Sequence, residues 1–200
     1  MQFNEFYKKY FKYLTPTVSV IFWLSLIFAF QGVREGIMTV LAAAVHEFGH
    51  FLCSLAILKS PTAPYGVLSG FRMKRGRMLS YGEELALYIS GPAANLLLSL
   101  LLSLLPSHTA KEISLISMFT MLSNLLPIEG YDGYGAAMAA AGALGAESAV
   151  ESALRCISFA LTLVMLLISL YLMYYLNGGY WIYAIFSLSA LSFIKKRLNS

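Results

Sequence analysis

Residues 36–58 read GIMTVLAAAVHEFGHFLCSLAIL, an apolar run whose only ionisable motif is HEFGH at positions 46–50. A run of this length meets the roughly 20 residues that an α-helix needs to cross a bilayer. Ionisable side chains inside such a helix are energetically costly and mark a functional site by default. The stretch therefore predicts a membrane helix with a chemical site inside it.

The rest of the chain is similarly apolar. Of its 200 residues, 58% are hydrophobic and 12% are charged, and the mean hydropathy is +0.70. Soluble domains carry about 25% charged and about 45–50% apolar residues. We therefore expect an all-α membrane protein, because lipid offers no partners to open backbone groups. Residues 1–200 are interpreted as one transmembrane domain.

Apolar runs with few charges predict about six transmembrane helices. The first is expected to stay as a span, because its apolar region is too long for a signal peptide. The basic loop at 60–82 has aromatic and β-branched residues between glycines, which favours a small β-hairpin or strand. A loop resting on anionic lipid headgroups is the alternative for it. The expected spans lie near residues 15–33, 36–58, 84–105, 110–127, 152–176 and 180–194.

The basic residues indicate an orientation. All but Arg34 and Lys111 of the 14 lysines and arginines fall on one side of the expected membrane arrangement. The positive-inside rule makes that side cytoplasmic and places both termini there. This topology accounts for the net charge of +4, so we expect the lipid bilayer, and no nucleic acid, as the partner of the basic loops.

The HEFGH motif has the spacing of a metal site. Residues four apart lie on one face of a helix, so His46 and His50 can bind one metal ion while Glu47 acts on a water. A catalytic zinc ion has three protein ligands, so one more is needed. Asp132 is the single aspartate of the chain and is expected at the same cytoplasmic end. Alone, Asp132-Gly133 would be typical of a turn, but the missing ligand favours a metal-binding role.

Three motifs together resemble those of the site-2 protease family of intramembrane zinc metalloproteases. They are HEFGH at 46–50, GPAAN at 91–95 and NLLPIEGYDG at 124–133. The arrangement is most similar to the bacterial sporulation branch, which contains a protease that processes a sigma-factor precursor. The resemblance covers roughly residues 36–140, which leaves the expected spans at 15–33 and 152–194 as accessory.

The resemblance implies one zinc ion held by His46, His50 and Asp132, with Glu47 as the catalytic base. Its implied activity is an intramembrane zinc endopeptidase that uses metal-activated water. The implied substrate is a membrane-associated protein, such as a transcription-factor precursor or regulator, cut near the cytoplasmic face of a bacterial cell membrane. A membrane regulatory partner is also expected.

Two asparagines in these motifs are further candidates for the site. The resemblance places Asn95 and Asn124 near the substrate, with Asn124 as a donor to the reaction's oxyanion. An interhelical hydrogen bond is the alternative for Asn95, because membrane helices use amides as packing partners. A capping or interhelical amide is the alternative for Asn124.

Two other functions fit parts of the same pattern. The first is a membrane-bound HExxH peptidase of another family, whose third ligand is a downstream glutamate such as Glu147 or Glu151. The second is a non-catalytic zinc-binding membrane regulator. Glu47 argues against the regulator, because a purely structural zinc site needs no general base.

Overall fold

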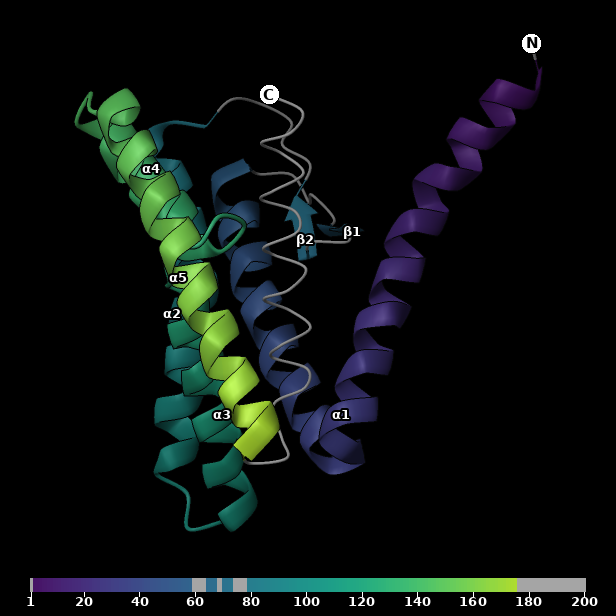
Figure 1. Ribbon diagram of the computed structural model, residues 1–200, viewed down its shortest axis with the longest axis vertical. Helices are drawn as coiled ribbons and strands as arrows, with labels where there is room; N and C mark the ends of the chain where they lie inside the picture. The colour runs from purple at the N-terminus through teal and green to yellow at the C-terminus, as the bar shows by residue number, and fades with distance from the viewer. Residues whose placement is uncertain (1, 59–63, 68–69, 74–78, 176–200) are drawn as a thin grey trace.

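The computed structural model describes all of the chain except residues 1, 59–63, 68–69, 74–78 and 176–200. The described part is helical apart from one antiparallel pair of short strands, in which Pro64 pairs with Met73 and Val67 with Gly70. In chain order the elements are α1 (Gln2–Leu58), β1 (Pro64–Val67), β2 (Gly70–Met73), α2 (Tyr81–Ser103), α3 (His108–Asn124), α4 (Asp132–Ala143) and α5 (Glu147–Tyr175) (Figure 1).

Helix α1 consists of two arms that meet at Gly32. This residue has φ 81° and ψ 174°, a conformation that glycine adopts without steric cost. The first arm diverges from the other helices, and the second joins them (Figure 1). Just after the bend, an ion pair of 2.6 Å between Arg34 and Glu112 connects the second arm to α3.

Helix α2 is the centre of the bundle, because it contacts α1, α3 and α4. It begins with a capping box, in which Ser80 and Glu83 each bond the other's backbone N–H. Its approach to α1 is close at Gly49, where a Cβ atom would lie 2.5 Å from the backbone oxygen of Ser90. The helix thus brings the HEFGH and GPAAN motifs into contact.

Small polar side chains are buried in the bundle together with apolar ones such as Leu87 and Ile128, whereas many large apolar side chains are exposed. This pattern suits a lipid environment in which small polar residues join helices. The chain is therefore an integral membrane protein. Exposed apolar residues include Val33, Leu97, Leu101, Leu115, Leu163 and Leu167, whereas buried polar residues include Ser54, Asn95, Ser99, Ser114, Ser117, Ser158, Thr162 and Ser169.

Three described helices are long and apolar enough to cross a membrane: Gln31–Ile57, Tyr81–Ser103 and Glu147–Tyr175. They correspond to the spans expected at 36–58, 84–105 and 152–176. The expectation of about six spans is not confirmed. Helix α3 takes the place of the span expected at 110–127, and its 17 residues are at the short end of the range for a full span.

The remaining expected spans compare differently with the structure. The run at 15–33 belongs to the helical backbone of α1, and the run at 180–194 lies outside the described residues. Helix α4 is an element that the sequence pattern did not predict. It is rich in glycine and alanine, and its 12 residues are too few to register as a span.

Candidate active site

Two histidines from α1 and one aspartate from α4 bring their ligand atoms together. Oδ2 of Asp132 lies 2.9 Å from Nε2 of His46 and 3.1 Å from Nε2 of His50. The two Nε2 atoms are 3.1 Å apart. Both histidines are buried, at 5% and 8% exposure. Among the described residues, these three form the group with the geometry to hold a metal ion.

The three ligand atoms fit a zinc ion. Tetrahedral zinc with bonds of about 2.0–2.1 Å places neighbouring nitrogen and oxygen ligands roughly 3.3 Å apart. The observed separations of 2.9 and 3.1 Å reach that value with shifts of a few tenths of an ångström. A glycine preserves the space, because a Cβ atom on Gly91 would meet Nε2 of His50 and lie 2.8 Å from Nε2 of His46.

Each histidine is also held at its other ring nitrogen. Nδ1 of His50 lies 2.8 Å from the backbone oxygen of Leu87, to which it donates, and 3.2 Å from Oγ of Ser90. Nδ1 of His46 lies 3.2 Å from the amide of Asn95. Hydrogen bonds of this kind orient metal-binding histidines and select the ring nitrogen that faces the metal.

Asp132 reaches the histidines because a tight turn precedes it. The N–H of Tyr131 donates to the carbonyl of Ile128 at 2.9 Å, and between them Gly130 has φ 101°, as a type II turn requires. Ile128 anchors the turn in the bundle at 1% exposure. Asp132-Gly133 itself begins α4 and is not the turn. The carboxylate thus lies at the positive end of a helix.

Two further contacts hold this connection in place. The N–H of Glu129 donates to Oγ of Ser158 on α5 at 2.8 Å. A Cβ atom on Gly133 would meet the backbone oxygen of Leu125, so the start of α4 packs tightly against the end of α3. The position of the Asp132 carboxylate therefore depends on α3 and α5 as well as on its own helix.

Glu47 lies beside the three ligand candidates. Its side chain is half-buried and interacts electrostatically with His46, His50 and Asp132. A carboxylate beside a metal site can accept a proton from a water bound there. This arrangement corresponds to the role of general base expected from the HExxH spacing.

The two candidate asparagines occupy different positions. Asn95 is fully buried at 0% exposure, and its amide lies between His46 on α1 and Ser117 on α3. This is the interhelical bond considered as an alternative to substrate contact. Asn124 is partly buried, and its NH2 group donates to the carbonyl of Thr120 in its own helix at 2.9 Å. An NH2 group has a second N–H to donate.

The alternative third ligands have other partners. Glu147 accepts a hydrogen bond of 3.2 Å from the hydroxyl of Tyr81, and Glu151 pairs with Arg155 on the next turn of α5. Neither belongs to the metal-binding group found among the described residues. The geometry therefore favours Asp132 over a glutamate as the third ligand.

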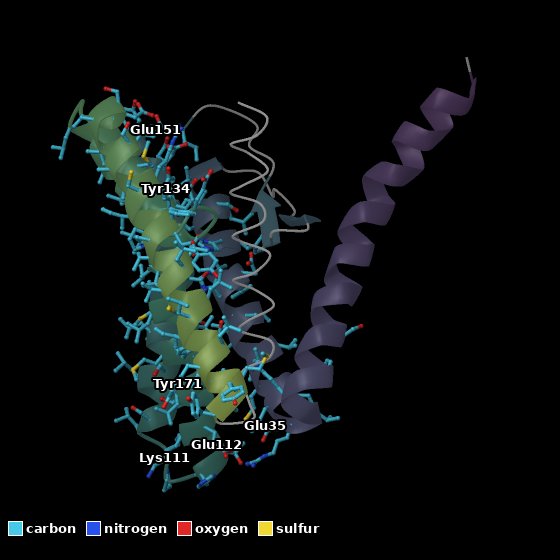
Figure 2. All side chains as sticks on the ribbon, viewed as in Figure 1. Glu35, Lys111, Glu112, Tyr134, Glu151 and Tyr171 are labelled. Carbon is cyan, nitrogen blue, oxygen red and sulfur yellow. The ribbon has the colours of Figure 1, made fainter. Side chains whose placement is uncertain are left out.

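Polar residues also lie around the start of α4. Burial raises the pKa of Tyr134 above its ordinary value, and the nearby charge of Glu129 raises it further, so the phenol stays neutral. The charge of Arg155 acts on Tyr134 in the opposite direction and lowers its pKa. Figure 2 shows Tyr134 and Glu151 toward one end of the bundle and Lys111 near the other.

The fold has a counterpart among solved structures. The Site-2 Protease from Methanocaldococcus jannaschii is similar with a TM-score of 0.58 and 16% sequence identity, and the match covers 88% of each chain. The chain shares its fold with this protease. No protein-family model matches the sequence, and no curated protein matches it. The likeness extends well beyond the part of the chain that holds the three motifs.

Proposed function

We propose that the chain is an intramembrane zinc endopeptidase of the site-2 type. The observation that carries this proposal is the buried triangle of His46, His50 and Asp132 ligand atoms, with Glu47 beside it, inside a bundle of apolar helices. Its fold, shared with a site-2 protease, supports the same conclusion. A site with a glutamate as third ligand has no such support, because the Glu147 carboxylate accepts a hydrogen bond from the hydroxyl of Tyr81.

The residues have separate roles in the proposed hydrolysis. A bound zinc ion would acidify water and polarise the scissile carbonyl. Glu47 takes the proton that the water loses and delivers it to the leaving amine, as one general acid–base group acting twice. The second N–H of Asn124 is our candidate donor to the oxyanion. Asp132 and the two histidines are the three protein ligands that would hold the ion.

The proposed substrate is a membrane-associated protein that is cut near the cytoplasmic face. A helical substrate hides its scissile bond, so it has to become extended before attack. The hairpin of β1 and β2 lies beside the second arm of α1 (Figure 1), and a strand edge can pair with an extended chain. Processing of a sigma-factor precursor stays a prediction from the motif arrangement.

Co-expression with candidate single-span proteins tests the proposal. The native chain should generate a new substrate terminus, which mass spectrometry would map to a position near the membrane. Glu47→Gln should bind zinc as the native chain does but lose cleavage by at least about 100-fold, the usual contribution of a general acid–base group. Cleavage by Glu47→Gln at the native rate would overturn the mechanism.

Ligand variants separate this proposal from its alternatives. Asp132→Asn should lower both zinc content and cleavage, whereas Glu147→Gln should leave both unchanged. The reverse pattern would indicate a glutamate-liganded peptidase. Zinc binding by the native chain without cleavage of any co-expressed membrane protein would favour a non-catalytic regulator.

A further inference from the structure

A series of polar contacts begins at Nδ1 of His46, the ring nitrogen on the side away from the ligand atoms. Nδ1 of His46 lies 3.2 Å from the amide of Asn95 on α2. Oγ of Ser117 on α3 lies 3.3 Å from the other amide atom of Asn95 and 3.1 Å from its backbone oxygen. Asn95 and Ser117 are both 0% exposed. Their hydrogen bonds must therefore be made within the protein.

In the structure, Nδ2 of the Asn95 amide faces His46 and Oδ1 faces Ser117. In that orientation two oxygens of Asn95 compete for the single hydroxyl proton of Ser117. A half-turn of the amide exchanges oxygen and nitrogen, which are nearly equal in size. The amide then donates to Oγ of Ser117, and the hydroxyl donates to the backbone oxygen of Asn95. One amide N–H of Asn95, the hydroxyl proton of Ser117 and a proton on Nδ1 of His46 then each have an acceptor.

This orientation of the amide has a consequence for His46. The amide oxygen of Asn95 then faces Nδ1 of the ring and accepts its proton. A neutral imidazole carries one ring proton, so a proton held at Nδ1 leaves Nε2 with a free electron pair. Nε2 is the atom that lies 2.9 Å from Asp132. The contact thus leaves Nε2 unprotonated, and this is the nitrogen that faces the other ligand atoms.

We propose that Asn95, held by Ser117, is a positioning residue that keeps His46 in the tautomer whose Nε2 binds the metal ion. The backbone oxygen of Leu87 has the same effect on His50, whose Nδ1 lies 2.8 Å from it. One ligand is thus oriented by a backbone oxygen and the other by a side chain, and both groups come from α2. This inference rests on the proposed metal site. It gives Asn95 of the GPAAN motif a role in orienting a metal ligand.

Zinc affinity of the purified full-length chain tests the role directly. Competition with a chelating dye measures the affinity without any substrate. Asn95→Leu, which has similar volume but no acceptor, should weaken zinc binding by about 10- to 100-fold, as for other groups that orient metal ligands. Ser117→Ala should weaken it in the same direction. Asn95→Asp should restore binding, because a carboxylate accepts the Nδ1 proton as the amide oxygen does.

Ser114 provides a matched control one turn before Ser117. It is also buried on α3 and also bonds α2, because its hydroxyl donates to the backbone oxygen of Ser99 at 2.8 Å. Ser114→Ala should lower the thermal midpoint of the zinc-free protein about as much as Ser117→Ala does, yet leave zinc affinity unchanged. Equal losses of zinc affinity in the two serine variants would reduce Asn95 to a packing role and overturn the inference.

The outcomes distinguish this inference from the proposed function. A native chain that binds no zinc would overturn the metal site and the role of Asn95 with it. A native chain that binds zinc, with Asn95→Leu and Ser117→Ala binding it equally well, would overturn the positioning role alone. If Asn95→Leu fails to fold, the comparison of Ser117→Ala with Ser114→Ala decides the question.

Discussion

Gly91 shows how a single residue can control the space of the candidate site. It lies on α2 opposite the two histidines, and a Cβ atom on it would meet Nε2 of His50 and lie 2.8 Å from Nε2 of His46. Pro92 follows it and cannot donate a backbone hydrogen bond. The interior of α2 therefore combines two residues that weaken a helix. The position of Gly91 beside the ligand atoms explains why this helix would contain a glycine there.

Gly91→Ala should block the site while leaving the bundle folded. The added methyl group occupies space beside the ligand atoms, so zinc affinity should fall by about 10- to 100-fold, the range found when groups around a metal are perturbed. Gly82→Ala is the matched control on the same helix, because a Cβ atom there meets nothing within 4 Å. Metal analysis of the purified variants would measure the effect. Full zinc content in Gly91→Ala would contradict the crowding argument.

The spacing of residues in the sequence indicated some residues of the candidate site but gave no signal for others. His46 and His50 were predictable because both lie on one helical face, and Asp132 was predictable as the one aspartate of the chain. Ser117 gave no such signal, because a serine in a membrane helix is common and its contact with Asn95 links separate helices. Such partners become visible only when the packing of α2 against α3 is known.

At the scale of whole elements, α4 depends on small residues for its close contact with α2. A Cβ atom on Gly135 would meet the ring of Tyr88, and one on Gly142 would meet the ring of Tyr81. These contacts position the helix whose first residue is Asp132. The sequence did not predict α4, because a short segment of glycine and alanine lacks both the length of a span and a clear apolar face.

The two glycines should differ in their tolerance of a methyl group. Gly135→Ala should destabilise the fold by about 1–3 kcal/mol, as overpacking usually does, and lower zinc affinity through Asp132. Gly142→Ala should cost less, because Tyr81 is 42% exposed and can rotate away, losing only its bond to Glu147. Thermal unfolding midpoints of both variants would test this. An equal or larger loss for Gly142→Ala would contradict it.

At the scale of the whole molecule, length and composition predicted the helices that meet lipid but not the complete arrangement. Apolar runs were sufficient for the three long spans, because each run is longer than the hydrocarbon core requires. The run at 110–127 was interpreted as a fourth span. In the structure it forms a helix of 17 residues, which begins after its N-cap Ser107 and ends before Leu125, slightly earlier in the chain than expected at both ends. Apolar composition does not reveal where a helix is capped.

The orientation of the bundle gives the last prediction. Lys111 and Glu151 lie toward opposite ends (Figure 2), and the positive-inside rule places the Glu151 end in the cytoplasm. In a chain whose Cys53 and Cys156 are replaced by alanine, a membrane-impermeant maleimide should label Lys111→Cys in intact cells. It should label the exposed position of Ser148→Cys only after permeabilisation. The opposite pattern would invert the orientation and move the proposed cleavage to the other membrane face, because the Asp132 turn lies nearer to the Glu151 end than to the Lys111 end.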